Sequence, residues 1–277
     1  MNNSLLTLFF TAGNGIQTWS QVGNLNRELA IYNGLTKKNI HNQFVTYDRS
    51  IEPSLIKKLK PIHLLPTPWL STPEKTSMRL LIRYFPSLIK SDIFKTNQIL
   101  GSDVAVKVKK ILRKPLITRC GYLHSLFTKE ITNDSHVIEE AVNLERKAFL
   151  SADMGVVTTE LQREYVIKEY ELDPEKIEVI PNYVLTSEFK PQNIEKRWDL
   201  LYVGRDSPQK NLLSLLQSLE IIKQHGNSIS LLLLGGAGQS VELENYAKSK
   251  DLDVTFLPNV PNEKIPEYMN MSKSFIL

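Results

Sequence analysis

The sequence predicts an α/β fold on the basis of two observations. Short apolar runs bounded by glycine, proline or polar residues have the length and composition of buried strands. Between many of them lie longer stretches with apolar residues in steps of three and four, as amphipathic helices have. One such helical face follows Lys210 and contains Leu212, Leu215, Leu216, Leu219 and Ile222. Strands that alternate with helices in this way are typical of parallel sheets covered by helices.

Eight of the apolar runs are predicted to be strands. In chain order they are residues 5–10, 43–47, 115–119, 154–158, 176–180, 200–203, 230–234 and 254–256. The last residues, 274–277, have the composition of a strand that is just beginning. Residues 186–197 are polar, and their apolar residues have neither the spacing of a helix nor that of a strand. They are therefore predicted to link two domains, 1–188 and 198–277. The second domain is short for a doubly wound sheet, and we expect it to be incomplete.

Composition and charge exclude several classes of protein. The chain has 277 residues and a formal net charge of +4, with 42% hydrophobic and 23% charged residues, as in soluble globular proteins. This balance excludes a disordered chain and a nucleic-acid protein held by charge alone. The single cysteine, Cys120, excludes a disulfide framework and a zinc site of several cysteines. The near absence of cysteine makes a reducing cytosol the expected compartment. No Lys or Arg precedes Arg27, so a signal peptide is not expected.

The segment around residues 200–212 combines a strand, a glycine and two cations. Gly204 allows a tight turn at the end of the predicted strand, Arg205 follows it, and Lys210 lies just before the next helix. Ligands of open α/β sheets bind at this carboxyl edge. Two cations beside a helix N-terminus suit a diphosphate, because charge and free backbone N–H groups both favour an anion.

A second glycine loop follows the strand at 230–234. Gly236 and Gly238 let the backbone approach a ligand closely. The dinucleotide-binding fingerprint would need a third glycine where this loop has Val241. The glycine loop near the N-terminus, residues 11–19, also lacks the third glycine, because it has Thr18 there. No Gly-Lys-Ser or Gly-Lys-Thr sequence occurs, so a P-loop is also absent. These patterns count against an NAD enzyme and a P-loop NTPase.

Taken together, the motifs resemble family 4 of the GT-B glycosyltransferases, the glycosyl transferases group 1. They stand in the family's order: Gly13-Asn14-Gly15, Ile180-Pro181-Asn182, Phe189-Lys190-Pro191, Gly204-Arg205 with Lys210-Asn211, Gly236-Ala237-Gly238, residues 254–260 and Ile265-Pro266-Glu267-Tyr268. The resemblance covers nearly the whole chain. It implies two Rossmann-like domains that face each other across a cleft, with a nucleotide sugar held mainly by the C-terminal one.

The resemblance also implies roles for single residues. Arg205 and Lys210 would bind the donor diphosphate and stabilise the negative charge that builds on the leaving nucleotide. Five further residues would lie at the donor: Gly15, Gly204, Gly236, Gly238 and Val260. Members of the family are similar to retaining transferases that work without a metal, so we expect no metal and no cofactor, only a UDP- or GDP-sugar as substrate.

Several positions depart from the family's pattern. Leu185 replaces the hinge aspartate and Tyr183 a glycine. Many members carry a histidine just after the fourth N-domain strand, which we expect here at residues 115–119. Arg119 has the equivalent position and could contact the acceptor or a phosphate, or pair with a carboxylate. His124, five residues later, is either a site residue or an ordinary half-buried histidine.

The largest departure is at the end of the chain. The family's paired glutamates, seven residues apart, would follow the strand that includes Phe275, and the sequence ends before them. We therefore expect this polypeptide to be inactive or very weak as a transferase.

The sequence thus predicts a glycosyltransferase that moves a sugar from a nucleotide sugar to a glycan or lipid-linked acceptor, as in polysaccharide biosynthesis. Two alternatives share the fold: a non-catalytic protein that binds a nucleotide sugar, and a sugar-nucleotide epimerase.

A basic helix is predicted at residues 104–114. Its five cations are Lys107, Lys109, Lys110, Arg113 and Lys114. Such a helix face is either simply solvated or docks on anionic lipid at the inner face of the membrane, where a lipid-linked acceptor would lie. Nucleic-acid binding is not expected, because the net charge is small and no recognition motif occurs.

Overall fold

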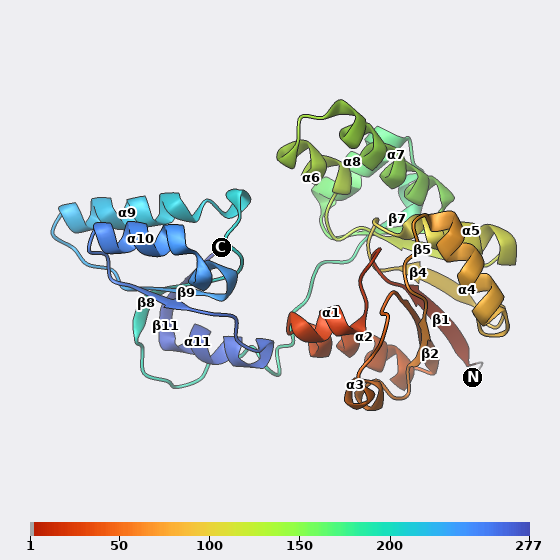
Figure 1. Ribbon diagram of the computed structural model, residues 1–277, viewed down its shortest axis with the longest axis horizontal. Coiled ribbons are helices and arrows are strands. Elements are labelled where there is room, and N and C mark those ends of the chain that lie inside the picture. Colours follow the sequence, from red (N-terminus) through yellow and green to blue (C-terminus); the bar gives the residue numbers. More distant parts are fainter. Residues whose placement is uncertain (1–2) are drawn as a thin grey trace. The chain divides into compact units, whose positions relative to one another are not determined.

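The computed structural model describes residues 3–277, which form two units (Figure 1). Unit 1 ends at Tyr183, and unit 2 spans Val184–Leu277. Each unit is built on its own parallel sheet with helices on its faces, which confirms the predicted fold class. No helix among the described residues is long and apolar enough to cross a membrane.

The sheet of unit 1 has seven parallel strands in the order β3-β2-β1-β4-β5-β6-β7. The strands are Ser4–Phe9 (β1), Ile40–Thr46 (β2), His63–Pro66 (β3), Ile93–Thr96 (β4), Leu116–Arg119 (β5), Met154–Val157 (β6) and Ile177–Val179 (β7). The central strand β1 is nearly continuous in apolar residues and pairs on both edges, so its side chains are largely buried on both faces.

Eight helices and one short 3₁₀ turn connect these strands. They are Ile16–Gln21 (α1), Leu25–Lys37 (α2), Pro53–Lys58 (α3), Pro73–Leu88 (α4), Ser102–Leu112 (α5), His124–Ile131 (α6), Ser135–Ser151 (α7), Glu160–Tyr170 (α8) and Pro174–Lys176 (η1). The strand order grows outward from β1 in both directions. Right-handed crossovers therefore place α1 to α3 on one face of the sheet and the helices that lead to β4 through β7 on the other.

The sheet of unit 2 has four parallel strands in the order β10-β9-β8-β11. They are Trp198–Val203 (β8), Leu231–Leu234 (β9), Val254–Leu257 (β10) and Ser272–Ile276 (β11). The helices Leu212–Gln224 (α9) and Val241–Ser249 (α10) pack on one face, and Ile265–Met271 (α11) packs on the other. Three 3₁₀ turns complete the unit: Pro208–Lys210 (η2), Gly235–Gln239 (η3) and Asn262–Lys264 (η4).

All eight predicted strands are present with shifted ends, and the strand that begins near the end of the chain is β11. The sequence analysis missed β3 and β4. Residues 115–119 therefore contain the fifth strand of unit 1, and the expectation of a fourth strand there is wrong. The fourth strand, β4, is followed by Asn97 and Gln98 rather than by a histidine.

Candidate functional site

The strand order of unit 2 reverses at β8. From β8 the chain moves through α9 to β9 and β10, and it later returns through α11 to β11 on the other side of β8. Helices on opposite faces leave a crevice at the carboxyl end of the strand where the order reverses, and ligands of open α/β sheets bind there. Gly204 and Arg205 follow β8 directly, so the topology places the predicted donor residues at this point.

Two glycine loops pack against each other at this edge. The Gly204 N–H donates to the Leu234 carbonyl at 3.0 Å, and the Ala237 N–H donates to the Gly204 carbonyl at 2.9 Å. A Cβ on Gly236 would lie 3.1 Å from the Arg205 Cα, and one on Gly238 would lie 1.8 Å from the Leu257 carbonyl oxygen. The packing of the loops thus already requires a glycine at 238 and leaves little room for a side chain at Gly236, whatever the loops bind.

Arg205 and Lys210 are exposed, and neither forms an ion pair with any residue in 3–277. Asp206, beside Arg205, instead accepts a hydrogen bond from the Ser240 hydroxyl at 2.7 Å. Lys210 ends η2, one residue before the N-cap of α9, Asn211, whose φ is +47°. The first turn of α9 contains no acidic residue, and no side chain caps it. This edge therefore combines two free cations with the positive end of a helix.

Val260 lies in the loop after β10. Its side chain is half-buried and packs against the apolar cluster on the α11 side of the sheet. The structure thus gives Val260 a packing role, and its predicted place near a nucleobase stays a prediction.

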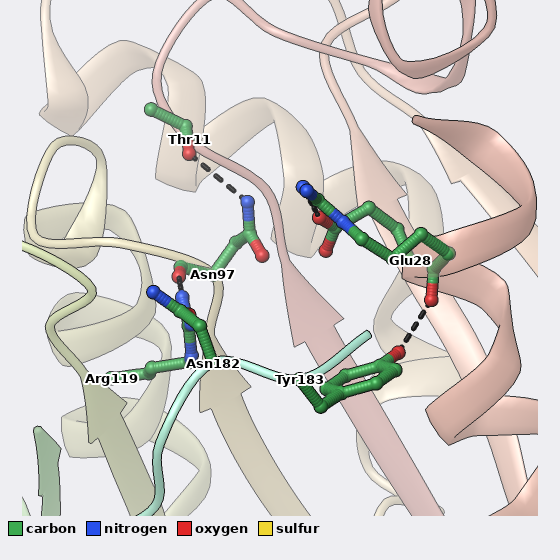
Figure 2. A network of polar contacts seen from close by, with 7 residues as sticks. Thr11, Glu28, Asn97, Arg119, Asn182 and Tyr183 are labelled. Atoms are coloured by element: carbon green, nitrogen blue, oxygen red, sulfur yellow. Dashed lines mark hydrogen bonds and ion pairs between the residues drawn. The ribbon is translucent and has the colours of Figure 1, made fainter. Parts of the chain in front are cut away.

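The strand order of unit 1 reverses between β1 and β4. The residues that follow these two strands meet there, because the Asn97 amide donates to the Thr11 hydroxyl at 3.3 Å (Figure 2). Arg119, the last residue of β5, joins the same network. Its guanidinium donates to the Asn97 carbonyl at 3.3 Å and to the Asn182 side-chain oxygen at 2.9 Å. The predicted Arg119 therefore lies at the carboxyl edge beside the reversal point.

The partners of Arg119 are neutral. No carboxylate in residues 3–277 forms an ion pair with it, so pairing with a carboxylate, one of the two predicted roles, is wrong. The half-buried guanidinium thus lies without an ion pair among residues 3–277 at an edge where ligands bind in this class of fold.

Lys95 was not identified from the sequence, yet it belongs to this region. It lies on β4, and its ammonium contacts the Tyr32 hydroxyl at 3.3 Å and lies 5.7 Å from the centre of that ring. Burial, and after it the like charge of Arg119, lower the pKa of Lys95 to about 7 against the opposing effect of Glu28. The strand itself was missed, so no signal in the sequence marked this lysine.

Tyr183 anchors the segment that follows β7. Its hydroxyl donates to the Arg27 carbonyl, and Arg27 in turn pairs with Glu28 at 2.6 Å (Figure 2). The tyrosine thus stands where the resembled family has a glycine and ties the end of unit 1 to α2.

Gly15 lies where the chain enters α1, but the nearest anion is the protein's own. The Asp48 carboxylate accepts hydrogen bonds from the Ile16 N–H at 2.9 Å and the Gln17 N–H at 3.1 Å. A Cβ on Gly15 would come within 2.2 Å of that carboxylate. The absence of a side chain at Gly15 is therefore explained by Asp48, and its contact with a donor phosphate stays a prediction.

His124 is the first residue of α6 and is half-buried, and its Nδ1 is buried without a hydrogen-bond partner. Burial lowers the pKa of His124, and Glu145 opposes this. Glu145 is fully buried and accepts hydrogen bonds from the Ser125 hydroxyl at 2.8 Å and the Tyr170 hydroxyl at 2.7 Å. His124 thus neighbours a structural carboxylate, and no hydrogen bond within residues 3–277 joins it to Arg119.

The described residues contain neither a reactive cysteine nor a cluster of metal ligands. Cys120 is fully buried, and burial raises the pKa of its thiol, as expected for a packing residue. An Asp-x-Asp sequence occurs at residues 251–253, where Asp251 pairs with Lys223 at 2.7 Å. No group of three or more His, Cys, Asp or Glu side chains is placed to hold a metal ion in the described part of the chain.

Comparison with known proteins identifies the fold of the chain and a family match for its C-terminal part. Residues 185–277 match the family model described as glycosyl transferases group 1. A search of curated proteins found no match. Among solved structures, sucrose-phosphate synthase from Thermosynechococcus elongatus is similar over 98% of this chain and 74% of its own, at 15% identity and a TM-score of 0.73. HepE from Anabaena in complex with UDP is similar over 98% of this chain and 73% of its own, at 16% identity and a TM-score of 0.64.

A third solved structure is the lipopolysaccharide outer core galactosyltransferase WaaB. It is 15% identical, with 98% of this chain and 73% of that chain covered and a TM-score of 0.61. At these identities the structures show the fold, two Rossmann-like sheets of the GT-B type. The fold expected from the sequence is thereby confirmed, and the match to the family model lies within residues 185–277.

Proposed function

Because residues 185–277 match the family model of the glycosyl transferases group 1, we propose that this protein is a glycosyltransferase. We propose that it binds a nucleotide sugar at the carboxyl edge of β8. One observation carries the proposal. Arg205 and Lys210 lie beside the positive end of α9, at the point where the strand order of this sheet reverses, and neither pairs with a carboxylate in the described part of the chain.

The chemistry of sugar transfer fits such an edge. When the bond between the anomeric carbon and the diphosphate breaks, negative charge builds on the leaving nucleotide. A guanidinium and an ammonium fixed beside the diphosphate stabilise that charge more than they stabilise the intact donor. Arg205 and Lys210 would therefore act on the leaving group, and the packed glycine backbone would hold the loop that carries Arg205.

The donor that we propose is a UDP- or GDP-sugar, and the transfer that we propose is retaining and independent of metal. The similar HepE structures hold UDP or UDP-glucose, which favours the uridine donor. A glycan or lipid-linked acceptor is proposed because the similar WaaB is a lipopolysaccharide outer core galactosyltransferase. Arg119 and His124 are proposed on the acceptor side, where the unneutralised Arg119 suits an acceptor with an anionic group.

Peripheral contact with an anionic membrane belongs to the same proposal, but α5 supports it less than its sequence suggested. Lys107 pairs with Glu74, and Lys109 pairs with Asp153 at 2.5 Å. Two of the five cations predicted to meet lipid are therefore already neutralised within the protein.

Isothermal titration with UDP and UDP-glucose tests the donor edge. Arg205→Ala and Lys210→Ala should each weaken binding by about tenfold or more, because each removes a charge-assisted contact to the diphosphate. Arg197→Ala is the matched control, since Arg197 is exposed and directly precedes β8, at the opposite end of the same strand. It should bind like the wild type.

If Arg205→Ala and Arg197→Ala lost affinity for UDP to the same extent, the assignment of the donor site would be contradicted. Release of UDP in the presence of a glycan or lipid-linked acceptor tests transfer itself. Binding that depends on Arg205, without transfer to any acceptor, would favour the non-catalytic binding protein over the transferase.

A further inference from the structure

Helix α4 exposes a stripe of large apolar side chains. Met78 is 58% exposed, Ile82 78% and Phe85 48%, and Ile89, which caps the helix, is 41% exposed. These residues follow one another in steps of four, three and four, and α4 is kinked at Tyr84, so Phe85 and Ile89 lie beyond the kink. The opposite side of α4 is buried in the core of unit 1, with Leu80 and Leu88 fully covered. The helix thus has two apolar faces, and only one of them is used by the fold.

Cations border the exposed stripe. Lys75, Arg79, Arg83 and Lys90 are exposed, and none of them forms an ion pair with any residue that the structure describes. The only acidic residue of the helix, Glu74, pairs with Lys107 of α5. This surface therefore carries four cations without a compensating carboxylate.

Apolar and cationic side chains line one shallow hollow on this surface. Its volume is about 530 Å³, and it is lined by Leu70, Lys75, Met78, Arg79, Ile82 and Arg83. Water solvates the charged heads of the cations while their stems extend the apolar area. A helix of this composition is suited to the boundary between lipid headgroups and acyl chains, where it meets phosphates and hydrocarbon together.

We propose that α4 docks unit 1 on the surface of an anionic lipid bilayer. Met78, Ile82 and Phe85 enter the acyl boundary, and Arg79 and Arg83 bind lipid phosphates. An anionic bilayer is favoured over a protein partner because the cations lie along the whole apolar stripe with no acidic residue among them. The proposal names the membrane surface of the proposed function, but it does not depend on the donor, because vesicle binding needs no nucleotide sugar.

Co-sedimentation of the full chain with vesicles tests this proposal. One set of vesicles is phosphatidylcholine alone, and the other is an equal mixture of phosphatidylcholine and phosphatidylglycerol. The wild type should bind the mixed vesicles and bind phosphatidylcholine much less. Arg79→Gln with Arg83→Gln should lower the partition coefficient roughly 30-fold, since each cation near the surface contributes roughly fivefold. Lys57→Gln with Lys58→Gln makes the same charge change on α3, where both lysines are exposed, and should bind like the wild type.

A second pair of variants, one on the apolar stripe and one control, tests the apolar contribution. Ile82→Ser should reduce binding to the mixed vesicles, and Leu161→Ser should not, although Leu161 on α8 is exposed to the same extent, 79% against 78%. Unchanged far-ultraviolet circular dichroism shows that each variant is folded.

Three results would overturn the proposal. They are no binding of the wild type to mixed vesicles, equal losses within either matched pair, and a concentration-dependent dimer that Ile82→Ser abolishes while vesicle binding persists. Normal donor binding alongside any of them would leave the proposed transferase intact.

Discussion

Lys95 lies in a buried environment that disfavours its protonated, charged form. It lies on β4 inside the seven-stranded sheet, against the ring of Tyr32, with Arg119 nearby and Glu28 as the opposing charge. Burial removes water from the ammonium, and the like charge of Arg119 adds repulsion, so the pKa of Lys95 falls to about 7. Near neutral pH, Lys95 is therefore only partly protonated in the folded protein.

This shift predicts a pH dependence of stability. Between pH 7 and the ordinary lysine value of 10.5, the unfolded chain binds a proton at Lys95 that the folded chain has released. The free energy of unfolding should therefore rise with pH in this window because of Lys95, by at most about 1.4 kcal/mol per pH unit. Urea unfolding of wild type and Lys95→Met across the window measures it, since the contribution is the difference between the two curves.

Lys90→Met serves as the control, because Lys90 is exposed and has no ion pair within the described residues. Its curve should run parallel to that of the wild type. A Lys95→Met curve that also runs parallel would show that the lysine keeps its ordinary pKa in the folded protein.

Single residues were predictable where their signal is local. Gly204 and Arg205 follow a strand directly, and Arg119 ends one, so a pattern of a few residues places them at a sheet edge. Lys95, Asp48 and Glu145 gave no such signal. Asp48 acts on backbone groups 31 and 32 residues away, and Glu145 receives hydrogen bonds from two other helices. Pairings over such distances are set by the tertiary fold.

At the scale of elements, α1 shows how a short helix depends on a distant residue. Six residues are too few for a stable isolated helix. Asp48, which lies just beyond β2 and is 8% exposed, supplies an anion to the first backbone N–H groups of α1. The carboxylate thus satisfies donors that the helix leaves open and interacts favourably with the helix dipole.

Gly15→Ala should destabilise unit 1 by about 1 to 3 kcal/mol, because the new Cβ occupies the space of the Asp48 carboxylate and breaks this cap. Asp48→Ala should cost a similar amount. The double variant should cost little more than either single one, since both remove the same interaction. Thermal or urea unfolding measures all three, and additive costs would contradict the shared cause.

Gly34→Ala is the internal control in the same unit. Gly34 lies inside α2, and a Cβ there would meet no atom within 4 Å. The substitution should stabilise the protein by about 0.5 to 1 kcal/mol through helix propensity.

The two strands missed from the sequence are also the least strand-like. β4 contains Lys95 among its four residues, and β3 begins with His63 and ends with Pro66. A proline is tolerated there because β3 lies at the edge of the sheet, where one side of the strand needs no partner. Strands that consist of an unbroken apolar run, such as β9, were placed to within a residue. Hydrophobic pattern thus predicts strands that are apolar runs and misses short strands interrupted by a charged residue or a proline.

At the scale of the whole molecule, each unit has its own core. The apolar clusters of unit 1 contain residues up to Val179, and those of unit 2 begin at Trp198. The polar composition of residues 186–197 predicted a division in this part of the chain, and the contacts divide the chain after Tyr183. The last two residues before this boundary, Asn182 and Tyr183, bind Arg119 and the Arg27 carbonyl through their side chains, and no periodic pattern marks these two contacts.

A fragment of residues 1–183 should therefore fold alone, since it keeps the complete seven-stranded sheet, both apolar clusters and the anchored end. A fragment of residues 1–180 should also fold but be less stable by about 1 to 3 kcal/mol. It loses the Tyr183 bond to α2, and it leaves the charged Arg119 with fewer partners.

Urea unfolding of both fragments measures the difference, and amide hydrogen exchange compares the longer one with the same residues in the full chain. Matching protection in β1, β2 and β4 is expected, because these strands take their partners from within unit 1. The Asn182→Ala variant of the longer fragment separates the two contacts, since it removes only the acceptor of Arg119. Equal stability of the two fragments would mean that Asn182 and Tyr183 follow the fold of unit 1 without contributing to it.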